Sequence, residues 1–70
     1  MDAQRRELAR QLFVTATELL EGAHEDSIAG QSPHLNVRAC RKSADRLRAV
    51  ARDLAALADA VTLMARVRAT

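Results

Sequence analysis

The sequence predicts an all-α fold: an antiparallel αα-hairpin whose two helices meet through heptad seams of alanine and leucine. Hydrophobic residues make up 49% of the 70 residues, but 15 of these hydrophobic residues are alanines. Phe13 is the only Phe, Tyr or Trp. Gly and Pro occur only at Gly22, Gly30 and Pro33, which is too little turn chemistry for a multi-stranded β fold. On both sides of this stretch, apolar residues recur every seven positions. A chain of this length forms one domain, residues 1–70.

The first helix is predicted over about residues 3–26. Its alanines at Ala9, Ala16 and Ala23 are seven residues apart, and small residues at this spacing let two helix backbones approach closely. Phe13 and Leu20 alternate with the alanines and are expected on the same inward seam, while two further leucines flank it. These flanking residues are Leu12 and Leu19. The apolar row stops at Ala23, and the helix is expected to end between Gly22 and Gly30, because Gly22 can be either a C-cap or an interior glycine.

The turn is predicted at about residues 27–32 and the second helix at about residues 33–68. Ser32 has the side chain of an N-cap, and Pro33 suits the first helical position. No glycine or proline follows until the end of the chain, so the second helix can run for roughly 52 Å at 1.5 Å per residue. A short connection between two long amphipathic helices favours antiparallel neighbours.

The second helix has the most regular pattern in the sequence. Two series with seven-residue spacing form the predicted seam: Ala44, Ala51, Ala58 and Ala65, and Cys40, Leu47, Leu54 and Val61. A third series adjoins the seam: Val50, Leu57 and Met64. Charged residues with the same spacing mark the opposite, solvent-facing side: Arg38, Asp45, Arg52, Asp59 and Arg66. The arrangement is typical of a heptad seam with alanine at one position and a larger residue at the other.

One hairpin is expected to leave its core incomplete. With the turn centred near Gln31, residues 61–70 extend beyond the first helix and leave Val61, Leu63, Met64 and Val67 in water. A single cysteine excludes an intrachain disulfide, and chains this small often gain stability by self-association. The sequence therefore predicts a symmetric homodimer that forms a four-helix bundle. The residues expected to carry this assembly are Leu12, Phe13, Leu19, Leu47, Leu54, Leu57, Val61 and Met64.

The charges are distributed unevenly between the two helices. Residues 1–33 carry three arginines against six acids, and residues 34–70 carry eight basic residues against three aspartates. Four cations near the start of the second helix form a candidate contact with a nucleic-acid phosphate backbone, because arginine suits bidentate phosphate contacts. These are Arg38, Arg41, Lys42 and Arg46. The alternative is that they only neutralise the carboxylates at the end of the first helix.

The alternating alanine and leucine layers and the basic segment of the second helix resemble the pattern of Rop-type proteins. That resemblance implies a hairpin dimer that binds paired RNA loops. Rop-type proteins use an exposed phenylalanine of the first helix, whereas Phe13 is expected on the inward seam here. The nucleic-acid function is therefore kept as the second interpretation.

A few residues near the turn have chemistry that a catalytic or metal site could use. Glu21 and His24 have the spacing of one ligand pair in di-iron carboxylate bundles, and His24, His34 and Cys40 could meet as zinc ligands. The pair His24-Glu25 is similar to the His-acid pair of dimerising sensor histidine kinases, which implies phosphotransfer. The simpler interpretation is that Cys40 is a core residue and that the histidines are solvated, with no metal or cofactor.

The sequence contains no phosphate-binding glycine loop, no nucleophile triad and no apolar run of the length that crosses a membrane. The leading interpretation is a non-enzymatic, cytoplasmic protein that homodimerises and acts through protein–protein interaction, as an adaptor or regulator. Its expected partners are a second copy and, in addition, another protein. Nucleic-acid binding through the basic segment is the alternative, and a metal-binding or phosphotransfer bundle around Glu21 and His24 is a more remote one.

Overall fold

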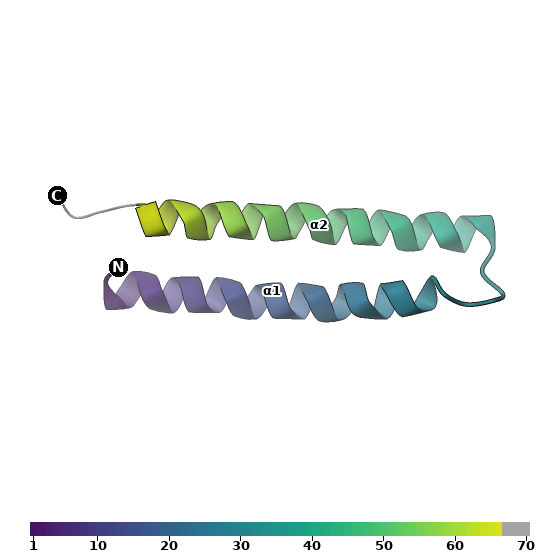
Figure 1. Ribbon diagram of the computed structural model, residues 1–70, viewed down its shortest axis with the longest axis horizontal. Coiled ribbons are helices and arrows are strands. Elements are labelled where there is room, and N and C mark those ends of the chain that lie inside the picture. Colours follow the sequence, from purple (N-terminus) through teal and green to yellow (C-terminus); the bar gives the residue numbers. More distant parts are fainter. Residues whose placement is uncertain (67–70) are drawn as a thin grey trace.

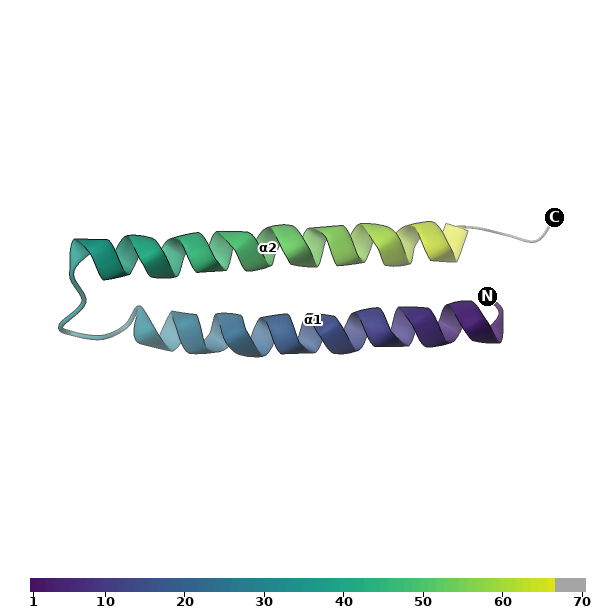
Figure 2. The same ribbon diagram turned by 180° about the vertical axis from the view of Figure 1, so that it is seen from behind.

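The computed structural model describes residues 1–66, which form two antiparallel helices joined by one turn (Figure 1). Helix α1 spans Ala3–Ala29 and helix α2 spans Val37–Arg66. The two helices lie side by side along their length, and the opposite view shows the same arrangement (Figure 2). The predicted all-α hairpin is confirmed.

Helix α1 begins at an aspartate cap and continues three residues past its predicted end. The Asp2 side chain accepts a hydrogen bond from the Arg5 backbone N–H at 2.8 Å. The helix passes through Gly22 without interruption and stops where the N–H of Gly30 donates to the carbonyl oxygen of Asp26. Gly22 is thus an interior glycine of the helix, one of the two roles left open by the sequence.

Helix α2 begins later than the sequence predicts. Ser32 accepts a hydrogen bond from the His34 N–H at 3.2 Å, and its carbonyl accepts one from Leu35, so Ser32 closes a local turn instead of capping a helix. Asn36 provides the cap: its side-chain oxygen accepts from the Ala39 N–H at 2.8 Å. The connection between the helices therefore covers residues 30–36.

The contact between the helices uses two of the three apolar rows on each helix. Ala9, at 7% exposure, is the only buried residue within residues 1–66. On α1 the half-buried residues that share its side are Leu12, Ala16, Leu19 and Ala23. On α2 the half-buried side chains of the contact are Leu47, Val50, Leu54, Leu57, Val61 and Met64.

The row composition of the contact differs from the predicted seam. Phe13 and Leu20, expected to face inward, are 60% and 54% exposed. On α2 the alanine row is exposed, and the row of Val50 and Leu57 takes its place against α1. The physical reason is that an apolar stripe three rows wide is broader than one neighbouring helix can cover, so one row on each helix stays uncovered.

The relative position of the helices also differs from the prediction that residues 61–70 extend beyond α1. Val61 lies beside Leu12, and both Val61 and Met64 are half-buried. Of the four residues, Leu63 is exposed as predicted, and Val67 lies outside the described residues. The overhang is at the other end, where the first turn of α2 extends past the end of α1 and leaves Val37 72% exposed (Figure 1). The cause is the turn, which is longer and starts later than the sequence predicts.

Neither helix, within the described residues, combines the length and the apolar character that a membrane crossing requires.

Candidate interaction surfaces

One broad side of the hairpin is an apolar surface, which we call the apolar face. It is defined by Phe13, Leu20, Ala51 and Ala58, all of which are exposed. Phe13 and Ala58 line one apolar hollow together, which places their sides of α1 and α2 on the same face of the hairpin. The hollow is lined by Leu12, Phe13, Ala16, Leu54, Leu57, Ala58 and Val61. Every residue around it is apolar.

The opposite side of the hairpin, which we call the polar face, has a different composition. Its shallow hollow is lined by Thr15, Leu19, Asp53, Ala56 and Leu57. Seven residues before Asp53 on α2, Arg46 lies on this face and its Nη1 is 3.6 Å from Oδ1 of Asp26 on α1. The Asp26 side chain is 21% exposed, which makes this the most sheltered ion pair of the described residues.

The hairpin exposes more surface than a folded monomer of its mass. The chain has 5738 Å² of accessible surface. A globular monomer of 7.7 kDa has about 4,300 Å². Even if the four residues outside the described range receive the full surface of an unfolded chain, about 600 Å², an excess of roughly 800 Å² remains. That excess equals the area that one partner buries in a protein–protein interface of standard size, about 800 Å².

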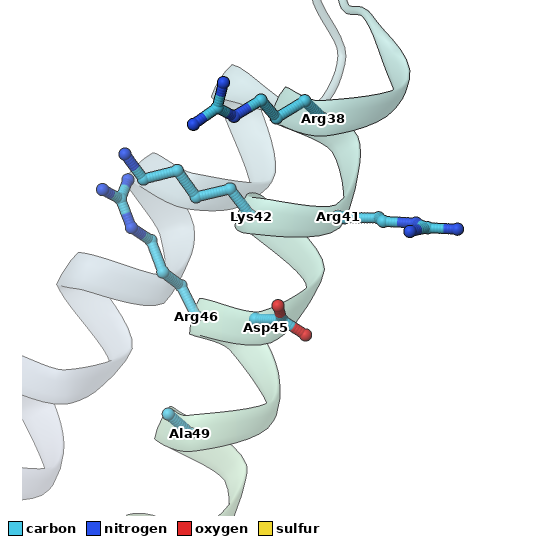
Figure 3. Close-up of a pocket in the computed structure, with 6 residues that line it drawn as sticks. All are labelled: Arg38, Arg41, Lys42, Asp45, Arg46 and Ala49. Atoms are coloured by element: carbon cyan, nitrogen blue, oxygen red, sulfur yellow. The ribbon is translucent and has the colours of Figure 1, made fainter.

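The basic cluster, defined by Arg38, Arg41, Lys42 and Arg46, lies near the start of α2 (Figure 3). Arg38, Lys42 and Arg46 are four residues apart and project to the same side of the helix, while Arg41 points the other way. The structure thus brings three of the four predicted cations together.

Carboxylates reduce the positive charge around the basic cluster. Arg46 is paired with Asp26 of α1, and Asp45 lies among the residues that line the cluster. The Asp45 carboxylate accepts a hydrogen bond from Arg48 at 2.8 Å. Within residues 1–66, no ion pair engages Arg38, Arg41 or Lys42. These three side chains are therefore the part of the cluster available to an external anion.

The predicted assembly residues divide into two groups. Seven of the eight are half-buried between the helices: Leu12, Leu19 and the five predicted residues of α2. They lie behind the apolar face, and we call this layer the leucine wall. Phe13 alone of the set stands on the exposed surface. The set did not include Leu20, which lies on the same exposed row seven residues later. Its signal was present in the sequence, because Leu20 alternates with the alanines as Phe13 does.

The residues considered for metal or phosphotransfer chemistry do not form a cluster. Glu21, His24, His34 and Cys40 are all exposed. The interpretation of Cys40 as a core residue is therefore wrong, because Cys40 lies in the first turn of α2, which extends past the end of α1. Across the part of the chain that the structure describes, no group of three or more His, Cys, Asp or Glu side chains is placed to hold a metal ion.

One exposed ion pair lies at the edge of α1. Arg10 Nη2 lies 2.7 Å from Glu7 Oε1, and its hydrogen bonds to the carboxylate lower the pKa of Glu7. The same interaction raises the pKa of Arg10. The pair holds the Arg10 guanidinium on the surface of the helix.

The sequence matches no family model, and comparisons with curated proteins and with solved structures find no match.

Proposed function

We propose that this protein is a non-enzymatic helical hairpin that homodimerises through its apolar face and acts through protein–protein interaction. The observation that carries the proposal is the exposure of Phe13 and Leu20 on a surface whose neighbouring residues are apolar. Contiguous apolar patches of this kind mark interaction sites, because leaving them in water costs roughly 25 cal/mol per Å².

A second hairpin on the apolar face would complete the core as a four-helix bundle. The half-buried leucines of the contact would then become fully buried, and Phe13 and Leu20 would gain apolar neighbours. The exposed alanines on α2 would let the incoming helices approach closely. One hairpin by itself buries only Ala9 among its described residues. Self-association would supply the apolar burial that a chain of this size lacks.

The mass in solution tests this proposal. Light scattering should give about twice the 7.7 kDa chain mass, and Phe13→Asp should reduce it to one chain because the charge would be buried without a partner. Val14→Asp is the matched control: Val14 is the next residue, is 45% exposed and lies off the apolar face. The control variant should remain a dimer. A wild-type chain that is folded and monomeric at micromolar concentration would contradict the proposal.

A second candidate function is binding of a nucleic-acid phosphate backbone through the basic cluster. It is favoured by the common direction of Arg38, Lys42 and Arg46, whose spacing forms a ridge of positive charge along one side of α2 (Figure 3). Such a ridge can follow a run of phosphates, and the affinity would fall steeply with salt.

A gel-shift assay with double-stranded RNA at two salt concentrations tests the second candidate. Arg38→Gln/Lys42→Gln should weaken binding about tenfold or more at low salt, because two phosphate contacts are lost. Arg6→Gln/Arg10→Gln removes the same amount of charge from the exposed surface of α1, away from the basic cluster, and serves as the control. Equal loss in both variants would mean that only the net charge matters and that the basic cluster is not a site.

A further inference from the structure

We infer that the second copy lies on the apolar face with its turn at the opposite end, and that the two-fold axis passes level with Thr17 and Ala55. The inference rests on the proposed homodimer and adds its topology and register. It is carried by three features of the chain: the spacing of residues on α1, the spacing of residues on α2, and the alignment of the two helices within one hairpin.

On α1, the exposed apolar residues are arranged symmetrically about one point. Phe13 and Leu20 lie on either side of Thr17, on the same side of the helix. If a second α1 runs antiparallel across this point, Phe13 of each copy meets Leu20 of the other. Both large apolar side chains are then covered, and Thr17 lies beside its own symmetry mate.

On α2, the alanines of the apolar face are arranged about a corresponding point. Ala51 and Ala58 are exposed and lie on either side of Ala55, which is itself small and exposed. An antiparallel second α2 centred here places Ala51 of each copy beside Ala58 of the other. No side chain larger than a methyl group then lies at the centre of this contact.

The charged row of α2 is self-complementary about the same point. Its residues alternate in sign: Arg38, Asp45, Arg52, Asp59 and Arg66, all exposed. In the antiparallel arrangement, Arg52 lies across from Asp59 of the second copy, and Asp45 lies across from Arg66. Each of these pairs occurs twice in a symmetric dimer, so four opposite-charge pairs border the contact.

The internal alignment of the hairpin places the two centres at the same level. The ion pair between Asp26 and Arg46 shows which residues of α1 and α2 lie opposite one another. Thr17 is nine residues before Asp26, and Ala55 is nine residues after Arg46, so in antiparallel helices they lie at the same height. A single two-fold axis can therefore pass through both centres. If the patterns on α1 and α2 were unrelated, their centres would not need to lie at the same level.

The arrangement with both turns at one end is less complementary. There α2 lies against α1 of the second copy, and the same alignment puts Asp45 level with Ser27 and Asp59 level with Phe13. Both aspartates would then lose the opposite charges that the antiparallel arrangement gives them, and Arg52 would be level with Leu20. The charged row of α2 is therefore the feature that distinguishes the two arrangements and favours the one with the turns at opposite ends.

Single cysteines distinguish the two arrangements. In a Cys40→Ala background, Ala55→Cys should cross-link to itself with a short bismaleimide, and Ala56→Cys, on the polar face, should not. The band of cross-linked dimer should be at least about tenfold stronger for the first variant. If instead Ala55→Cys reacts only when mixed with Thr17→Cys, the turns lie at one end and the inferred topology is wrong, while the proposed dimer stands. A wild-type chain that is monomeric by light scattering would overturn both.

A charge exchange gives a second test that does not depend on cross-linking. Asp59→Arg places two like-charged pairs at the contact and should weaken dimerisation about tenfold at low salt. Adding Arg52→Asp to the same chain restores opposite charges across the antiparallel contact and should recover the wild-type affinity. With the turns at one end, residues 52 and 59 do not meet across the contact, so adding Arg52→Asp would not recover the affinity. A double variant that binds no more tightly than the single one therefore contradicts the inference, and circular dichroism confirms that both variants remain helical.

Discussion

The apolar and polar faces of the hairpin are built on the same two helices and the same leucine wall, yet they present different chemistry. The apolar face exposes Phe13 and Leu20 together with a row of alanines. The polar face surrounds Leu19 and Leu57 with Thr15 and Asp53 and carries the ion pair between Arg46 and Asp26. The difference shows that one face of a two-helix unit can present polar groups to water while the other face exposes apolar side chains that a partner could cover.

The polar face needs no partner, because its charged groups are paired across the helices or solvated. The apolar face has no such provision: the hollow between Phe13 and Ala58 is lined only by apolar side chains. Water at such a surface is displaced favourably by another apolar surface. The asymmetry also limits assembly to one face, which favours a closed dimer over an open chain of hairpins.

The largest effect is expected from a charge in the wall that both faces share. Leu54→Asp would place a carboxylate between the helices without a partner, at a cost of at least about 3 kcal/mol per chain. We expect loss of the dimer and of most helicity, measured by light scattering and circular dichroism. Unchanged mass and helicity would mean that the heptad packing is not what holds the chain together.

The comparison of the faces itself is tested by two alanines on α2 that are two residues apart. Ala58→Asp lies on the apolar face and should cost the dimer a few kcal/mol, on the order of 3 kcal/mol, because two carboxylates are buried per dimer. Ala56→Asp lies on the polar face and should change the dissociation constant by less than about twofold. Sedimentation equilibrium measures both. If the two substitutions had equal effects, the distinction between the faces would fail.

A smaller effect of opposite sign is expected at Gly22 on α1. A Cβ built there meets no atom within 4 Å, so alanine fits without strain. Replacing an interior helical glycine by alanine should stabilise the fold by about 1 kcal/mol and raise the midpoint of thermal unfolding. Because Gly22 follows Thr15 by seven residues, the substitution is on the polar side and should leave the mass of the assembly unchanged. A lower midpoint would show that the space at Gly22 is needed by a neighbour in the dimer.

The smallest effect is expected at the ion pair of the polar face. The Arg46 side chain is more than half exposed and solvent screens the interaction, so Asp26→Asn should destabilise the fold by about 0.5 kcal/mol. The difference from the wild type should shrink further in 1 M salt. Urea unfolding at low and high salt measures it. A loss several times larger would indicate that the pair fixes the alignment of the helices and does more than neutralise the polar face.

Much of the fold follows from local patterns. The heptad spacing of Ala9, Ala16 and Ala23 and the long uninterrupted second segment predict two helices, and the structure has them. The start of α2 was predicted four residues early, since Ser32-Pro33 is a good initiation signal in isolation, whereas Asn36 makes the cap. Two adjacent segments with capping side chains compete at such a place, and local propensity does not decide between them.

The candidate sites were predictable in part. The basic cluster was found from composition, but the side on which each cation projects depends on the helix phase, which separates Arg41 from the other three (Figure 3). The apolar rows were also found, yet Phe13 was expected inside and stands outside. A heptad pattern shows which residues share a side of a helix, and it does not show how far the helix is rotated about its axis.

By itself, the sequence determined that the chain forms two amphipathic helices, which residues share each row, and how the charges alternate along α2. Only the tertiary structure decided which two of the three apolar rows meet, and that Asp26 lies opposite Arg46. The physical reason is that one helix covers a narrower stripe than three rows provide. The choice among rows therefore depends on the rotation and sliding of one helix against the other, which the seven-residue turn permits and the packing of the leucines fixes.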